Sequence, residues 1–417
     1  MSLRILMIAA FCILPAAWDA GGQQPPDPKL IQQARTLLAR SPLIDGHNDY
    51  PWTLWENAKR DLDKLDIRQP QPSIMTDIPR LRAGGVGGQF WSVYVPVELA
   101  GQTAVTATLE QIDIVHRMLR KYPDTFELAL TAADVERIFK SGRIASLIGM
   151  EGGHSIDSSL GALRMFHRLG ARYMTLTHSA HVPWADSSTG PAAAGGLTSF
   201  GEQVVREMNW LGMLVDLSHV SPDTMEDAIR VSDAPVIFSH SSARAVTDVV
   251  RNVPDQILRM LPQDGGVVMV TFVPGFLSPA VAAHTRAQTA EENRLKQQFP
   301  TDPAAAKAGV AAWSKANPAP RATLADAANH IDHLRKVAGI DHIGLGGDFD
   351  GISSVPSGLE DVSTYPALIA ELLRRGYTDD DVRKIAGLNI LRVMREVERV
   401  SARLQKERGP SVAHFGR

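Results

Sequence analysis

Short apolar runs and longer amphipathic stretches alternate along most of the chain. The apolar runs are mostly continuous, which is typical of strands that are buried on both faces in a parallel sheet. Between them, apolar residues recur at spacings of three and four, as they do on one face of a helix. Eight runs have the length and composition of strands: 43–49, 89–95, 144–151, 173–178, 212–219, 235–240, 266–273 and 342–349.

Several of the intervening stretches carry signals for the ends of helices. The apolar residues of 200–211 follow helical spacing, and Gly212 comes next as a helix stop. Ser221 followed by Pro222 predicts an N-cap and a proline at the first helical position. Three further N-caps are predicted by a Thr-x-x-Asp pattern, at Thr131, Thr323 and Thr378.

The alternation of eight strands with helices predicts an α/β fold, a (β/α)8 barrel of the TIM type, rather than an open doubly wound sheet. Two segments interrupt the repeat. The charged, proline-bearing segment 55–76 is predicted to form a lid or rim, and 278–322 is predicted to form a helical insertion between strands seven and eight. A C-terminal helical segment, from Pro366 to about Leu404, would complete the outer ring.

Composition is that of an ordinary globular protein. The 417 residues are 44% hydrophobic and 21% charged, with a formal net charge of -3. Since no block of basic residues is present, nucleic-acid binding is not expected.

Residues 1–22 have the pattern of a secretory signal peptide. Arg4 precedes an apolar run, and small residues follow it, so we expect cleavage after Gly22, with an uncleaved anchor as the alternative. Residues 23–417 would then form one exported domain, periplasmic or secreted. The only cysteine, Cys12, lies in the signal segment, so the mature protein would contain no disulfide and no stable membrane anchor.

Ionisable residues gather at the ends of the predicted strands. The first strand ends in His47-Asn-Asp49, and side chains two residues apart in extended backbone point to the same side. The C-terminal strand ends of a (β/α)8 barrel open onto one face, so residues far apart in the sequence meet there. The other strand-end residues are Glu151, His178, His219, His240 and Asp348.

Any one of these residues, taken alone, is more often structural than a metal ligand. A purely structural role would have to apply independently at six strand ends, so the joint pattern favours a metal site. Imidazoles and carboxylates without a thiolate suit Zn²⁺, and also match Mn²⁺, Fe²⁺ or Co²⁺. Two ions can be held if one carboxylate bridges them. The five predicted ligands are His47, Asp49, Glu151, His219 and His240.

Seven sequence blocks resemble those of the membrane (renal-type) dipeptidases, which are binuclear zinc peptidases of the amidohydrolase type on a (β/α)8 barrel. They occur in the same order, from about Leu43 to beyond Leu391. The blocks are LIDGHND at 43–49, GMEGGH at 149–154, TLTH at 175–178, VDLSH at 215–219, PVIFSHS at 235–241, RNVP at 251–254 and GGDFD at 346–350.

The resemblance implies a zinc-dependent dipeptidase in which a metal-bridging hydroxide attacks the peptide bond. His47 and Asp49 would bind one zinc, His219 and His240 the other, and Glu151 would bridge both. The substrates would be dipeptides with a free C-terminal carboxylate, and a D-residue at the C-terminal position would be tolerated. The family also implies a non-covalent homodimer.

Three further residues receive roles from the resemblance. His178 would contact the scissile carbonyl and stabilise the developing oxyanion. Arg251 would hold the substrate's carboxylate, which a guanidinium can bind through two hydrogen bonds. Asp348 would move a proton from the attacking water to the leaving amine.

Two departures from the family bear on substrate preference. His181 stands where the mammalian relatives are expected to have asparagine, and the segment 278–322 looks longer than usual. Two alternatives stay open: another binuclear amidohydrolase, acting on N-acyl amino acids or on cyclic amides such as β-lactams, and a catalytically silent binding homologue.

Overall fold

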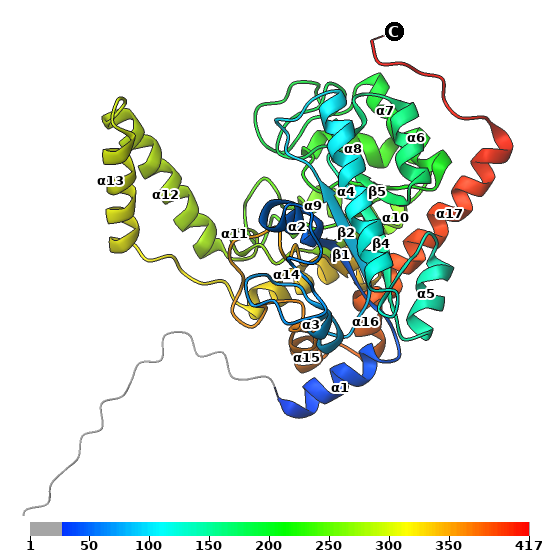
Figure 1. The fold of residues 1–417 in the computed structure, drawn as a ribbon, viewed down its shortest axis with the longest axis horizontal. Coiled ribbons are helices and arrows are strands. Elements are labelled where there is room, and N and C mark those ends of the chain that lie inside the picture. The colour runs from blue at the N-terminus through cyan, green and yellow to red at the C-terminus, as the bar shows by residue number, and fades with distance from the viewer. Residues whose placement is uncertain (1–26, 417) are drawn as a thin grey trace, which may run out of the picture.

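Nine parallel strands form the centre of the computed structural model, which describes residues 27–416 (Figure 1). The predicted signal segment 1–22 lies outside the described residues. Within residues 27–416, no helix has both the length and the apolar character needed to cross a membrane. The strands are β1 (Leu43–Asn48), β2 (Val86–Tyr94), β3 (Phe126–Leu128), β4 (Ile144–Glu151), β5 (Ala171–Thr175), β6 (Leu214–Asp216), β7 (Ile237–Phe238), β8 (Val267–Val270) and β9 (Ile343–Leu345).

Eight of these strands close into a barrel in the order β1, β2, β4, β5, β6, β7, β8 and β9. The ring closes because β1 pairs in parallel with both β2 and β9, with Asp45 opposite Leu345. The predicted (β/α)8 fold is therefore confirmed. The ninth strand, β3, was not predicted; it pairs only with the beginning of β4, where Phe126 lies opposite Ile144. Three residues are too few to show a strand pattern in the sequence.

Helices surround the barrel, and several begin at the predicted caps. Ser221 Oγ accepts a hydrogen bond from the backbone N–H of Thr224, with Pro222 at the first helical position. The helices around the barrel are α1 (Pro28–Leu38), α2 (Tyr50–Ala58), α3 (Ile78–Ala83), α4 (Gln102–Lys121), α5 (Ala132–Lys140), α6 (Leu160–Arg168), α7 (Ser199–Leu211), α8 (Pro222–Val231), α9 (Asp255–Leu258), α10 (Leu261–Asp264), α11 (Pro274–Leu277), α14 (Leu324–Val337), α15 (Tyr365–Arg374), α16 (Asp379–Arg383) and α17 (Asn389–Glu407).

The segment between β8 and β9 contains the predicted helical insertion. Helices α12 (Pro279–Gln298) and α13 (Pro303–Ala316) pack against each other and project from the barrel (Figure 1). Their buried residues are few: Ala282, Leu295 and Ala306. The insertion therefore adds a separate arm and contributes little to the barrel core.

Residues of the segment 55–76 form a fixed rim at the mouth of the barrel. After α2 ends, Leu65 and Ile67 are buried in the main apolar cluster. The backbone N–H of Met75 donates to Asp350 Oδ1 at 2.6 Å, which ties this segment to the loop after β9. Of the two predicted roles, lid or rim, these contacts match the rim.

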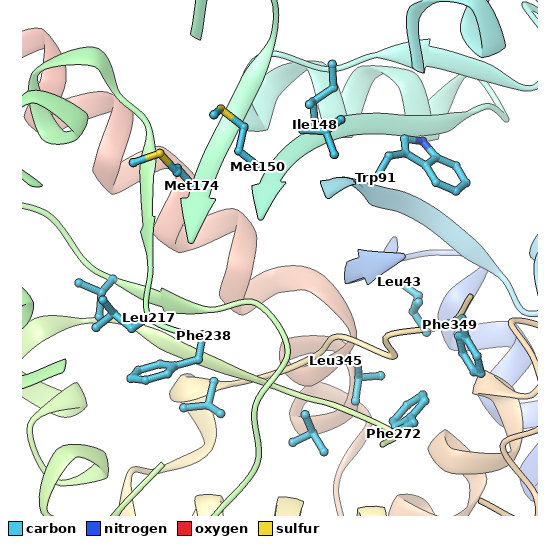
Figure 2. Packing of buried hydrophobic residues seen from close by; sticks show 14 of the residues in the cluster. Leu43, Trp91, Ile148, Met150, Met174, Leu217, Phe238, Phe272, Leu345 and Phe349 are labelled. Atoms are coloured by element: carbon cyan, nitrogen blue, oxygen red, sulfur yellow. The ribbon is translucent and has the colours of Figure 1, made fainter. Parts of the chain in front are cut away.

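Neighbouring strand residues face two different apolar clusters. Leu43 and Ile148 belong to the larger cluster, whose members are drawn in Figure 2. Ile44 and Leu147, the adjacent residues, belong to a second cluster that also contains Tyr173. Side chains alternate between the two faces of a strand, so the two clusters lie on opposite faces of the barrel strands. The larger cluster lies beneath the surrounding helices, and the second cluster, which contains Tyr173, reaches the barrel interior.

Asp264, at the end of α10, makes the stability of the fold depend on pH. Its Oδ2 atom accepts a hydrogen bond from Val236 N at 3.2 Å, and burial raises the pKa of its carboxyl from 3.8 to about 7. Between these pKa values the folded chain binds more protons than the unfolded chain, so the free energy of unfolding falls as pH rises.

We expect the thermal midpoint of the wild type to fall, relative to that of Asp264→Asn, between about pH 4 and pH 7, and the difference to level off above pH 7. Thermal melts across this range measure the effect. Parallel pH profiles for the two proteins would contradict the assignment.

Candidate metal-binding active site

The predicted site residues lie at or just beyond the C-terminal strand ends. His47 is in β1, Glu151 is the last residue of β4, and Asp49 directly follows β1. His178, His219, His240 and Asp348 lie in the loops after β5, β6, β7 and β9.

Four predicted strands are wrong at their C-terminal ends, because these strands stop before the site residues. Two of the loops carry a site residue with left-handed backbone: His219 has a φ of 68° and Asp348 a φ of 62°. Such left-handed backbone cannot continue a strand. The side chains of His219 and Asp348 therefore project from loops rather than from strands.

Glu151 stands at the centre of the group. Its Oε1 atom lies 3.0 Å from His219 Nε2 and 3.4 Å from His240 Nε2. Its Oε2 atom lies 3.5 Å from His47 Nε2, which in turn lies 3.2 Å from Asp49 Oδ2. All five predicted ligands thus converge, with a histidine on each side of the shared carboxylate.

The arrangement fits metal ions better than a purely protein network. His47 Nε2 is buried and has no hydrogen-bond partner among the described residues, although it faces two carboxylates. The Nε2 atoms of His219 and His240 are 2.9 Å apart and both face Glu151. Ring nitrogens and carboxylate oxygens aimed at common points are the donor set that zinc prefers.

The electrostatics also favour ligands in their metal-binding forms. Burial lowers the pKa of His219 and of His240 well below the usual range of histidine. Burial alone would raise the pKa of Glu151, but His47 and His178 hold this pKa well below its usual range. Neutral His219 and His240 beside an ionised Glu151 are in the forms in which these side chains coordinate a cation. His47 differs: burial lowers its pKa, but Tyr173, Asp49 and Glu151 raise it well above the usual range, so this ring must lose a proton before it can bind a metal ion.

The pKa of Asp348 is shifted in the opposite direction to that of Glu151. Burial raises the pKa of its carboxyl well above the usual range, and the nearby Asp49 and Glu151 raise it further. Asp348 groups with His47 and Asp49, with ligand-type atoms of all three within 4.8 Å of one another. A carboxyl group of raised pKa beside the candidate metal ligands holds a proton more readily than an ordinary aspartate, which suits a group that takes up a proton and then releases it.

A cavity of about 410 Å³ opens above these residues. Arg251 lies in its wall with 8% of its surface exposed, and its guanidinium lies 5.4 Å from the centre of the Phe276 ring. Burial lowers the pKa of Arg251 to about 10, so the side chain stays cationic at neutral pH. Among residues 27–416, no carboxylate lies within 4.0 Å of the guanidinium, which leaves its charge available to a ligand.

His178 also lines the cavity, and His181 faces away from it. His178 Nε2 lies 3.6 Å from Glu151 Oε1, and its ring packs 5.0 Å from that of Tyr94. His181 instead accepts a hydrogen bond at Nδ1 from Ser187 N, at 3.0 Å, and is not among the residues that line the cavity. The departure from the family at position 181 therefore affects the loop beside the site.

The sequence pattern did not identify the aromatic wall of the cavity or the residues behind the ligands. Trp52, Tyr94 and Phe276 line the cavity but have no distinctive spacing in the sequence. Tyr173 and Asp216 support ligand residues from inside the barrel. An aspartate within an otherwise apolar strand was the one available signal, because a buried carboxylate needs partners.

The sequence profile of the membrane dipeptidases, peptidase family M19, matches residues 31–408. The chain belongs to this family. Two curated members are similar over most of their length. Dipeptidase verJ of Clonostachys rogersoniana is 42% identical over 396 residues, which cover 92% of this chain and 91% of that protein. Dipeptidase 3 of Mus musculus is 43% identical over 379 residues, which cover 90% and 68%.

Solved structures show the same relationship. The probable dipeptidase PvdM of Pseudomonas aeruginosa superposes with a TM-score of 0.79 at 26% identity, covering 90% of this chain and 100% of that one. A metallo peptidase of Rhodobacter sphaeroides, bound to a phosphinate mimic of the dipeptide L-Ala-D-Ala, gives 0.71 at 26% identity, covering 86% and 99%. This membrane dipeptidase family member is therefore a metallo-dipeptidase, a hydrolase of peptide bonds.

Proposed function

We propose that this membrane dipeptidase family member binds two Zn²⁺ ions and hydrolyses dipeptides that have a free C-terminal carboxylate. The observation that carries the proposal is the convergence of four ligand-type side chains around Glu151, in a cavity that also contains a buried arginine with no carboxylate partner among residues 27–416. His47 and Asp49 would hold one ion, His219 and His240 would hold the other, and Glu151 would contribute a carboxylate to both. When bound, the two ions supply an activated water as nucleophile and polarise the scissile carbonyl.

The residues around the ions position the substrate and move protons. Arg251 binds the C-terminal carboxylate, and its buried position makes this ion pair strong. His178, on the same cavity wall, donates a hydrogen bond to the carbonyl oxygen as negative charge develops there. Asp348 takes a proton from the attacking water and gives it to the leaving amine.

The position of Arg251 also explains selection for dipeptides. A carboxylate fixed at this wall leaves only one residue between the clamp and the scissile bond. A tripeptide would place a neutral amide opposite the buried cation, which costs several kcal/mol in the absence of a compensating partner. Tolerance of a D-residue in the C-terminal position is supported by the L-Ala-D-Ala mimic bound to the Rhodobacter sphaeroides relative.

We propose further that the mature chain is exported and forms a non-covalent homodimer. Export is supported by the signal pattern of residues 1–22, and the lack of a disulfide by the position of the only cysteine within that segment. Light scattering of the purified mature chain measures the oligomeric state. A monomer at micromolar concentration would contradict the dimer.

Metal analysis combined with matched peptides tests the enzymatic proposal. We expect two zinc ions per purified chain, loss of activity on chelation, and recovery when zinc is restored. L-Ala-L-Ala and L-Ala-D-Ala should be hydrolysed, and L-Ala-L-Ala-L-Ala should not. Equal turnover of dipeptide and tripeptide would contradict the carboxylate clamp, and a metal-free but active chain would contradict the metal mechanism.

A further inference from the structure

A buried chain of hydrogen bonds runs behind the ring of His240. Ser239 Oγ donates to Asp216 Oδ2 at 2.6 Å and lies 2.8 Å from His240 Nδ1. A carboxylate only accepts hydrogen bonds, and a serine hydroxyl has a single hydrogen. Because this hydrogen goes to Asp216, Ser239 must accept one from the Nδ1–H of His240. The Nε2 atom of His240 then carries a lone pair and faces Glu151, 3.4 Å away.

His47 is held in a similar way by Tyr173, which lies on β5. The hydroxyl of Tyr173 donates to the carbonyl of Gly46 at 3.2 Å and lies 2.8 Å from His47 Nδ1. A carbonyl only accepts and the phenol has a single hydrogen, so both contacts are hydrogen bonds at once only if the phenol donates to Gly46 O and accepts from His47 Nδ1–H. The Nε2 atom of His47 is thereby left as an acceptor, facing Asp49.

We propose that Tyr173, and Asp216 acting through Ser239, are positioning residues that hold two histidines in the Nδ1–H tautomer. Only this tautomer leaves Nε2 of His47 and His240 free to bind a metal ion. The inference rests on the proposed two-metal function. It adds that the protein fixes which nitrogen carries the hydrogen in each neutral ring, through one hydroxyl in each case.

Asp216→Asn tests the proposal with a change of one atom. Asp216 Oδ1 accepts from two backbone groups, Ser218 N at 3.1 Å and Ser239 N at 2.8 Å, so the amide oxygen of asparagine must occupy this position. The amide NH2 must then occupy the Oδ2 position, which faces the hydroxyls of Thr175, at 2.5 Å, and Ser239.

The NH2 group donates to both hydroxyls, so Ser239 has to turn its own hydrogen toward His240 Nδ1. This change forces the hydrogen of the neutral ring onto Nε2, where it blocks metal binding. The backbone contacts of residue 216 stay satisfied, so the fold is preserved.

Two measurements decide the matter. In the metal-free proteins, at a pH where the ring is neutral, ¹⁵N NMR of histidine side chains reports which nitrogen of His240 carries the hydrogen. We expect Nδ1–H in the wild type and Nε2–H in Asp216→Asn. Competition with a zinc chelator should show that Asp216→Asn binds one of two ions about 10–100-fold more weakly.

Adding Ser239→Ala to Asp216→Asn provides the diagnostic comparison. Without the hydroxyl, nothing donates to His240 Nδ1, so the ring can return to the metal-binding tautomer and part of the zinc affinity should be regained. If Asp216 only braced the strands, the second substitution would add damage instead. Ser401→Ala is the matched control, because Ser401 is a buried serine whose hydroxyl donates to Trp210 O at 2.7 Å, away from the cavity.

Tyr173→Phe tests the second histidine independently. It should weaken the ion held by His47, whereas Tyr122→Phe, which removes a buried phenol bonded to Asp66, should not. Nδ1–H at His240 in Asp216→Asn, or a double variant that binds zinc more weakly than Asp216→Asn, would overturn the proposal. Failure of the wild type to bind two ions would contradict the proposed function instead, since the tautomers are measured without metal.

Discussion

Replacing Asp348 with asparagine is expected to lower kcat for dipeptides by about 10²–10⁴-fold while both zinc ions stay bound. A carboxamide cannot take a proton from water and pass it to an amine. The local fold should survive, because asparagine tolerates the left-handed backbone at this position, where φ is 62°. The backbone N–H of residue 348 also keeps its bond to His47 O, at 3.1 Å.

Steady-state kinetics together with metal analysis measures the effect. Asp350→Asn is a matched control: Asp350 is a second left-handed aspartate of the same loop, with φ of 66°, and it does not line the cavity. This variant should keep kcat close to the wild-type value. An Asp348→Asn enzyme with wild-type kcat would contradict the proton shuttle, and loss of zinc would reassign Asp348 as a metal ligand.

Replacing Arg251 with methionine should reduce kcat/KM for dipeptides by about 10²–10³-fold, as expected for loss of a buried, charge-assisted contact. Methionine keeps a long side chain over Phe276 but removes the charge. Arg251 is buried and has no carboxylate partner among the described residues, so removal of its charge leaves no buried carboxylate without an ion-pair partner. The thermal midpoint should therefore not fall.

Dipeptide amides provide the matched substrates for this prediction. They lack the carboxylate, so the wild type should hydrolyse them poorly and Arg251→Met should cause little further loss. Arg251→Lys keeps the charge without the bidentate geometry and should be intermediate. Equal losses for dipeptides and their amides would show that Arg251 does not bind the carboxylate.

The existence of the eight barrel strands could be predicted from the sequence, because buried parallel strands leave continuous apolar runs. Their ends could not be predicted well. The run at 342–349 continues to Phe349, yet β9 stops at Leu345. Asp348, three residues further on, has left-handed backbone, and a single aspartate in an apolar context does not reveal a positive φ.

The ligand side chains were accessible to sequence reasoning because barrel topology brings strand ends together. The structure places His47, Glu151 and His240 where that topology predicts. The residues behind the candidate ligands, Tyr173 and Asp216, could not be predicted in this way. Tyr173 looks like an ordinary core residue of a strand, and its contact with His47 joins two strands that are not neighbours in the sheet.

The cavity wall was harder to foresee for a different reason. Phe276 belongs to a four-residue helix in a connection, and its position over Arg251 is set by Asn252, whose Nδ2 donates to Phe276 O at 2.8 Å. Contacts between loops carry no periodic signal. The convergence of the candidate ligands could therefore be predicted, whereas the shape of the cavity could not.

Closure of the barrel has a consequence for how the protein acquires its metal. Asp45 pairs with Leu345, so the first and last strands meet only when nearly the whole chain has folded. The ligands are distributed from β1 to the loop after β7, and no short fragment contains the set. Local elements can form early, but long-range pairing of this kind comes late. Metal uptake during refolding should therefore lag behind helix formation and report the pairing of the last strand.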